Sequence, residues 1–168
     1  MKKIILFTAI VLLLTTIVSA QKPVKITPAN LKMIEGNWVG TLTYLDYKSN
    51  QPFTMPANTT FQQSKSNPNI YFRSIGYSTE PHANQKDTWV IGNNGSTLDD
   101  FTIISYKKLA ADSIIIITEK NGMDGNDNKP ALLRHTYTIS NHFFINKKEV
   151  KFDGTDKWLL RNIYKFSK

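Results

Sequence analysis

The sequence contains no cysteine in its 168 residues. Without thiols the chain cannot form a disulfide, a zinc–thiolate site, a thiol nucleophile or a lipid-modified N-terminal cysteine. Its stability must therefore come from burial of apolar surface and from hydrogen bonds. Whole classes of chemistry, among them thiol catalysis and thiolate metal centres, are excluded by this one absence.

Recognisable catalytic motifs are lacking as well. The sequence has no nucleophile elbow, no phosphate-binding loop and no paired-carboxylate motif. The three histidines, His82, His135 and His142, show no metal-ligand spacing. The alternating polar residues that begin at Asp124 resemble the opening of a calcium loop, but Lys129 occupies the position of the loop's glycine. We therefore expect a protein that is not an enzyme and that carries no cofactor and no metal ion.

Helical patterns are also scarce in this chain, and strand patterns are abundant. One short helical turn is expected between Pro28 and Glu35. Runs rich in β-branched and aromatic residues then alternate with clusters of glycine, proline, asparagine and aspartate, which is typical of antiparallel strands joined by turns. The predicted strands are Trp38–Tyr47, Asn58–Gln63, Ile70–Tyr77, Asp87–Ile91, Phe101–Leu109, Ser113–Lys120, Ala131–Ser140, His142–Phe152 and Trp158–Phe166.

The first twenty residues have the pattern of a cleavable secretory signal. Met1-Lys2-Lys3 is positively charged, the stretch from Ile4 to Val18 is apolar, and small residues precede a cleavage site after Ala20. The apolar stretch is shorter than the roughly 20 residues that a membrane-spanning helix needs. We expect residues 1–20 to be removed and residues 21–168 to form one domain that is periplasmic or secreted, without stable membrane insertion.

The charge of the chain is positive but dispersed. The formal net charge of +8 falls to +6 without Lys2 and Lys3. Lysines occur in scattered pairs, arginine occurs only at positions 73, 134 and 161, and no array interleaves arginine with aromatic residues. This pattern favours a solvated lysine-rich surface over a nucleic-acid interface, so no nucleic-acid partner is expected.

Alternation near the C-terminus predicts which side chains point inward. Leu133, His135, Tyr137 and Ile139 share one face of their strand, and Trp158, Leu160, Asn162, Tyr164 and Phe166 share one face of the last strand. A mostly apolar face that carries a few polar groups is typical of a small-ligand pocket. The predicted ligand-binding residues are His135, Tyr137, Asn162 and Tyr164. For His135, a hydrogen-bonded core position is the alternative.

A short helical turn followed by Gly36-Asn37-Trp38 resembles the opening of lipocalins and their calycin relatives. The chain also looks like an exported lipocalin-like type found in Bacteroidetes, on Tyr77-x-x-Glu80-Pro81-x-x-Asn84 and Arg161-Asn162-x-Tyr164. The resemblance implies that Arg161 packs across Trp38 at the closed end of a barrel. It departs from fatty-acid-binding proteins, because the spacing from Arg161 to Tyr164 places these two on opposite faces of a regular strand.

The sequence therefore predicts an all-β protein, an antiparallel up-and-down barrel of about 8–10 strands that is lipocalin-like and begins with a short N-terminal helical turn. The expected function is that of an exported protein that binds a small apolar or amphipathic ligand in the barrel. The loop from Glu80 to Asn84 is expected at the barrel mouth. The alternative is a module that binds protein or glycan and whose barrel core is filled.

Overall fold

The structure is a computed structural model that describes residues 24–46, 49, 51–110 and 112–168. The predicted signal, residues 1–20, lies outside the described residues. The helical segments are α1 (Pro28–Leu31) and the short 3-10 helices η1 (Lys32–Ile34), η2 (Pro81–Ala83) and η3 (Asn93–Gly95). The strands are β1 (Gly36–Asp46), β2 (Gln51–Gln63), β3 (Ile70–Gly76), β4 (Gln85–Gly92), β5 (Thr97–Leu98), β6 (Phe101–Ala110), β7 (Ser113–Asp124), β8 (Lys129–Ser140), β9 (Phe143–Phe152) and β10 (Leu159–Ser167).

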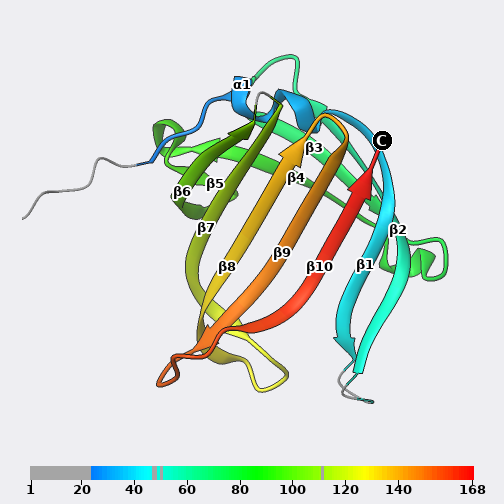
Figure 1. Ribbon diagram of the computed structural model, residues 1–168, viewed down its shortest axis with the longest axis vertical. Helices are drawn as coiled ribbons and strands as arrows, with labels where there is room; N and C mark the ends of the chain where they lie inside the picture. The colour runs from blue at the N-terminus through cyan, green and yellow to red at the C-terminus, as the bar shows by residue number, and fades with distance from the viewer. Residues whose placement is uncertain (1–23, 47–48, 50, 111) are drawn as a thin grey trace, which may run out of the picture.

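The strands form a closed antiparallel barrel in which each strand pairs with its neighbours in the chain and β1 pairs with β10 (Figure 1). The predicted fold class is confirmed, including the short helical turn before β1. The added strand is β5, whose two residues are too few to produce a recognisable alternation. Within the described part of the chain, no helix is long and apolar enough to span a membrane.

The strand β2 begins earlier than the sequence pattern predicted. Pro52 and Pro56 fall between the predicted strands Trp38–Tyr47 and Asn58–Gln63, yet both lie in β2, opposite Leu45 and Thr41 of β1. Proline is tolerated in a strand where its missing N–H would face away from the ladder. The register explains the exception, because β2 pairs with β3 only from Asn58 onward. Both prolines therefore lie where the second edge of β2 has no partner strand.

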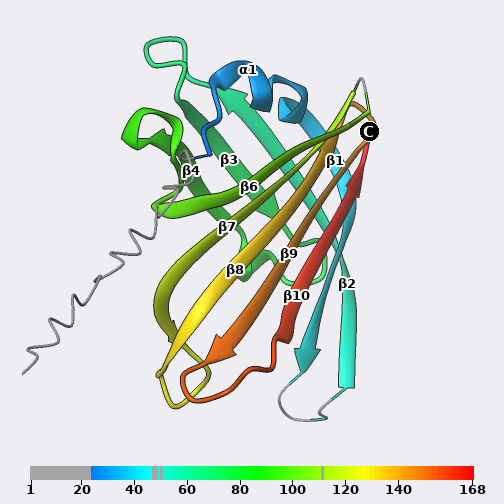
Figure 2. The ribbon, with the colours of Figure 1, turned by 60° about the vertical axis from the view of Figure 1, so that its left-hand side comes forward.

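One end of the barrel, which we call the closed end, is covered by α1 and η1 (Figures 1 and 2). Leu31 and Ile34 from these helices are fully buried in the same core cluster as Trp38. The Trp38 indole donates a hydrogen bond of 2.6 Å from Nε1 to the carbonyl oxygen of Ile34. Gly36 makes the tight connection possible, because its φ of +105° lies in a region that favours glycine. The segment from α1 to Trp38 therefore plugs the closed end of the barrel, and we call it the plug.

Aromatic side chains fill the barrel interior next to this plug. Phe144 makes edge-to-face contacts with Trp38, Phe61 and Trp89, at ring-centroid distances of 6.3, 5.6 and 5.9 Å. Edge-to-face arrangements of this kind stabilise a core beyond the burial of area alone. On the outer face of the barrel, by contrast, Val39 is 66% exposed. The inward face of β1 is therefore the face of Trp38 and Leu42.

The cation that packs on Trp38 is Lys168, and the predicted contact between Trp38 and Arg161 is wrong. The Nζ atom of Lys168 lies 4.2 Å from the centroid of the Trp38 ring. The β1–β10 register pairs Val39 with Ser167 and Tyr44 with Asn162. Arg161 thus lies seven positions away from Lys168 along β10, which is roughly 20 Å at about 3.3 Å per residue. The register of the closing strand pair decides which cation reaches the indole.

The other end of the barrel, which we call the mouth, carries the β1–β2, β7–β8 and β9–β10 hairpins (Figure 1). Beside the mouth the ladder between β4 and β7 is interrupted. Strand β4 pairs with β5 only at Ile91 and Gly92, and β6 pairs with β7 only as far as Thr102 opposite Glu119. Residues 85–89 of β4 and 120–124 of β7 therefore each leave one edge unpaired among the described strands. Beside this break the Phe101 ring, at the start of β6, packs on the His135 ring at a centroid distance of 5.1 Å.

Candidate functional site

The four predicted ligand-binding residues lie together on the inner wall of the mouth half. Tyr137 of β8 and Tyr164 of β10 are both register partners of Asn146, which lies between them on β9. One step nearer the mouth, His135 and Asn162 are both partners of Lys148. Parity along β8 and β10 therefore predicted that these four side chains share one wall, where they occupy two successive levels of the barrel. Their role in ligand binding stays a prediction.

Asn146 and Lys148 complete this wall, and the sequence reasoning missed both of them. They alternate with outward residues in the same way as the buried Phe144 and Val150 of β9. That alternation is visible in the sequence, and it predicts that Asn146 and Lys148 point inward. Asn146 is almost fully buried although it is polar.

His135 occupies a hydrogen-bonded position inside the barrel, as the alternative interpretation of this residue predicted. Its Nδ1–H donates to Oδ1 of Asn146 at 2.9 Å, and its ring stacks on Tyr137 at a centroid distance of 5.5 Å. Burial lowers the pKa of His135, and the nearby charges of Lys148 and Arg73 lower it further, against the opposing effect of the hydrogen bond to Asn146. A neutral imidazole with its proton on Nδ1 leaves Nε2 as an acceptor.

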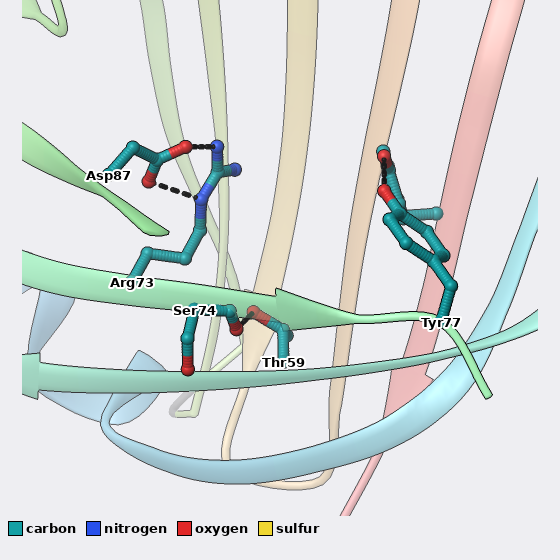
Figure 3. A network of polar contacts seen from close by, with 6 residues as sticks. Thr59, Arg73, Ser74, Tyr77 and Asp87 are labelled. Atoms are coloured by element: carbon teal, nitrogen blue, oxygen red, sulfur yellow. Dashed lines mark hydrogen bonds and ion pairs between the residues drawn. The ribbon is translucent and has the colours of Figure 1, made fainter. Parts of the chain in front are cut away.

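Across the barrel, Arg73 of β3 and Asp87 of β4 face each other as a cross-strand pair. Nε of Arg73 donates to Oδ1 of Asp87 at 2.8 Å, and Nη2 donates to Oδ2. The third guanidinium nitrogen, Nη1, is turned away from Asp87 in Figure 3 and makes no hydrogen bond with a described residue. The guanidinium also lies 5.5 Å from the centroid of the Trp89 ring, which holds it against the aromatic core.

Arg73 is a functional candidate that sequence reasoning did not identify. It alternates with the buried Tyr71 and Ile75 on β3, whereas Phe72 on the outer face is 52% exposed. Inward parity was therefore visible in the sequence. The pairing with Asp87 was not, because it depends on the register between two strands.

The hydroxyl groups of Tyr77 and Tyr164 hydrogen-bond each other at 2.7 Å and tie the end of β3 to β10 (Figure 3). The backbone N–H of Tyr77 donates to Oδ1 of Asn84 at 2.7 Å, so the loop between β3 and β4 is folded back on itself. This loop includes Glu80 and joins the ends of β3 and β4 that are directed toward the mouth. It is set back from the rim, where the sequence predicted it, because β2 continues from Ala57 to Gln51 beyond its last pair with β3. Burial raises the pKa of Tyr164, and its hydrogen bond with Tyr77 raises it further, so this phenol stays protonated at neutral pH.

Thr118 of β7 is fully buried and faces the interior opposite His135. Its Oγ1 is the buried side-chain oxygen that has no hydrogen-bond partner in the described part of the chain. Burial raises the pKa of the neighbouring Tyr137 phenol, and the Thr118 hydroxyl opposes that rise. The contact between the two hydroxyls falls short of hydrogen-bond geometry. A buried hydroxyl without a partner is uncommon, because its desolvation is then not compensated.

At the rim of the mouth, Asp124 bridges two cations on neighbouring strands. Nε of Arg161 donates to Oδ2 of Asp124 at 2.5 Å, and Nζ of Lys148 donates to Oδ1 at 3.1 Å. The side chains of Arg161 and Asp124 are only 12% and 11% exposed. The cluster ties the β7–β8 hairpin to β9 and β10.

The predicted outward direction of Arg161 is therefore wrong. The β9–β10 register shifts between Leu160 and Asn162, which leaves Arg161 in a bulge. A bulge re-aims side chains relative to strict alternation. Arg161 consequently contacts the ring of Phe152 at 5.4 Å, while Leu160 is exposed. Arg161 and Tyr164 therefore both point inward. The counterion of Arg161 is Asp124.

No group of three or more metal-ligating side chains gathers among the residues whose placement the structure describes. The chemistry available on this wall is hydrogen bonding, from one guanidinium nitrogen, several phenols, a threonine hydroxyl and a neutral imidazole. Together these groups can orient a bound molecule.

Comparison with known proteins bears on the fold. No protein-family model matches the chain, and no curated protein matches it in sequence. Among solved structures, the crystal structure of Rv2717c from M. tuberculosis is similar, with a TM-score of 0.54 and 9% sequence identity over 83% of this chain and 95% of that chain. At this identity the likeness shows a shared fold alone. It is consistent with a lipocalin-like barrel, while membership of the calycin superfamily and of the Bacteroidetes type stays a prediction. The β-barrel is thus a fold that this chain shares with a solved structure.

Proposed function

We propose that this chain is an exported, non-catalytic binding protein that holds a small apolar or amphipathic molecule in the mouth half of its barrel. The observation that carries the proposal is the division of the interior into two halves. Aromatic rings pack the closed half, whereas the mouth half is lined by partly exposed residues such as His135, Asn162 and Tyr164. An interior of mixed polarity that solvent can reach is the usual setting of a small-molecule site.

The break in the ladder between β4 and β7 supports the proposal. Beside this break the Asp87 side chain points inward and is still 37% exposed, so solvent reaches the inner wall there. At the rim, Tyr44 and Phe53 pack together at a centroid distance of 5.6 Å, and Phe53 is exposed. Apolar rings at the rim and polar groups below them match the two parts of an amphipathic molecule.

The direct test is a titration of the mature protein with Nile red, a neutral probe whose fluorescence rises in apolar surroundings. We expect saturable binding at one site, weakened by about fivefold in Tyr164→Ala, or about 1 kcal/mol. The matched control is Phe72→Ala, which removes an exposed aromatic side chain from the outer face of β3. Its affinity should equal that of the wild type. Both variants are compared well below their melting temperatures, because loss of a half-buried ring also lowers stability.

Native mass spectrometry of protein purified from its own host provides the second test. A co-purified molecule of small mass, lost on denaturation, would identify the natural ligand. If neither Nile red nor a host lipid extract binds to folded protein at up to about 1 mM, the proposal fails. The alternative, a protein- or glycan-binding module with a filled core, would then replace it.

A further inference from the structure

The interior of the mouth half offers more hydrogen-bond donors than the protein itself uses. Nη1 of Arg73 carries two N–H groups without an acceptor among the described residues. The Tyr77–Tyr164 pair shares one hydrogen bond, so one phenolic proton remains free. The Thr118 hydroxyl is buried and has no partner in the described part of the chain. The Arg73 guanidinium and the Tyr137 ring both contact the Trp89 ring, at 5.5 and 4.9 Å from its centroid, so these groups lie close together.

The positive charge of Arg73 is offset by the carboxylate that it binds. Two nitrogens of Arg73 are bound to Asp87, which offsets the guanidinium charge. Lys148 is paired with Asp124 at 3.1 Å, and burial lowers the pKa of His135. A carboxylate placed at Nη1 of Arg73 would lie beside the Asp87 carboxylate. Like charges at short range disfavour the ionised form, and burying a further charge adds a desolvation penalty.

Because the charge of Arg73 is already offset by Asp87, its free N–H groups favour an acceptor that carries no net charge. We propose that the ligand is an uncharged molecule that presents a carbonyl-type oxygen to Arg73 and the Thr118 hydroxyl, and that its apolar part extends toward Phe53 at the rim. This inference rests on the proposed function and names the chemical class of its ligand. Arg73 would supply a charge-assisted hydrogen bond, while Asp87 would keep the pocket closed to anions.

The test is displacement of Nile red by three amphiphiles of matched chain length, at mildly alkaline pH. Undecyl methyl ketone and dodecanoate share an undecyl chain and a carbonyl carbon. The ketone carries a methyl group where dodecanoate carries a charged oxygen. Dodecylamine serves as the cationic amphiphile. We expect the ketone to displace the probe at a concentration about tenfold below that of dodecanoate or the amine, the ratio typical of one hydrogen bond to a charged group. A preference for dodecanoate would overturn the inference.

Two variants test whether Asp87 and Thr118 select the ligand or only stabilise the fold. Asp87→Asn removes the negative charge and keeps the shape, so Arg73 loses its hydrogen-bonded counterion. We expect dodecanoate to gain about tenfold in affinity in this variant, and the ketone to change by less than about threefold. Thr118→Val keeps the volume and removes the hydroxyl, so the ketone should lose about fivefold in affinity while dodecanoate changes by less than about threefold, each value being calculated with the affinity of Nile red measured for that variant.

The matched control is Asp127→Asn, which removes an exposed carboxylate that pairs with Lys129 at the hairpin tip. It should leave the order of the three amphiphiles unchanged. If Asp87→Asn fails to raise the affinity for dodecanoate, Asp87 does not exclude anions and the inference fails. If no amphiphile displaces Nile red, or Nile red itself does not bind, the proposed function fails instead.

Discussion

Lys168, which follows the last strand, covers the indole ring of Trp38 at 4.2 Å and anchors its Nζ on the carbonyl oxygens of Met33 and Glu35, at 3.2 and 2.6 Å. A single side chain thus joins the end of the barrel to the 3-10 helix that plugs it. The arrangement resembles the contact that a lipocalin-like chain was expected to form, with a different residue in the role of the cation.

This contact predicts a measurable coupling between Trp38 and Lys168. In a double-mutant cycle with Trp38→Phe and Lys168→Met, we expect a coupling free energy of about 0.5–1 kcal/mol, typical of an exposed cation–π pair. Chemical denaturation of the four proteins measures it. The control cycle replaces Lys168→Met by Arg161→Met, and its effects should be additive because Arg161 lies roughly 20 Å away. Additivity in both cycles would show that Lys168 does not stabilise the plug.

Asp124 is expected to be the most sensitive carboxylate at the mouth. Asp124→Asn leaves Arg161 and Lys148 without their shared counterion, so we expect a loss of about 1–3 kcal/mol in the free energy of unfolding. Asp127→Asn is the matched control in the same hairpin, and its exposed pair with Lys129 should contribute less than about 1 kcal/mol. Equal effects of the two substitutions would argue against a buried charge cluster.

The lowered pKa of His135 predicts how stability depends on pH. A buried neutral imidazole binds its proton less readily in the folded chain than in the unfolded chain, whose pKa is near 6.5. The contribution of this residue is therefore complete above about pH 6.5 and is lost as the pH falls toward the folded pKa. Lys148 and Arg73 face the ring and act in the same direction.

Replacing His135 by Gln should flatten this part of the stability profile. Denaturant titrations of wild type and His135→Gln between about pH 7 and pH 5 measure the difference. His142→Gln is the control, since that histidine is exposed outside the barrel wall. The prediction fails if the two variants lose stability on acidification in parallel with the wild type.

Processing of the chain provides a prediction that is independent of the barrel. If residues 1–20 are a cleaved signal, the exported protein should begin at Gln21, either unmodified or cyclised to pyroglutamate. The intact mass of the protein recovered from the periplasm or the medium measures this. Recovery of the full-length chain from the membrane fraction would contradict both the cleavage and the proposed export.

Much of the inner wall followed from the sequence alone. Strict alternation from Leu133 to Ile139 placed Tyr137 inward, and alternation along the last strand did the same for Tyr164 and Asn162. The alternation of side chains between the two faces of a strand is a local property of extended backbone, so it can be predicted without knowledge of the partner strand. The same reasoning gave the all-β class and the helical turn before the first strand.

Other features depended on how strands far apart in the chain meet. The bulge that turns Arg161 inward, the break between β4 and β7, and the match of Lys168 with Trp38 all follow from register. Pro52 and Pro56 are allowed in β2 only because β3 is too short to pair with that part of it. The alternation of side chains depends only on neighbouring residues, whereas the register between strands and the closure of the barrel depend on the packing of the whole barrel. The sequence by itself therefore determined which face of most strands is buried, and the tertiary structure decided which buried groups meet.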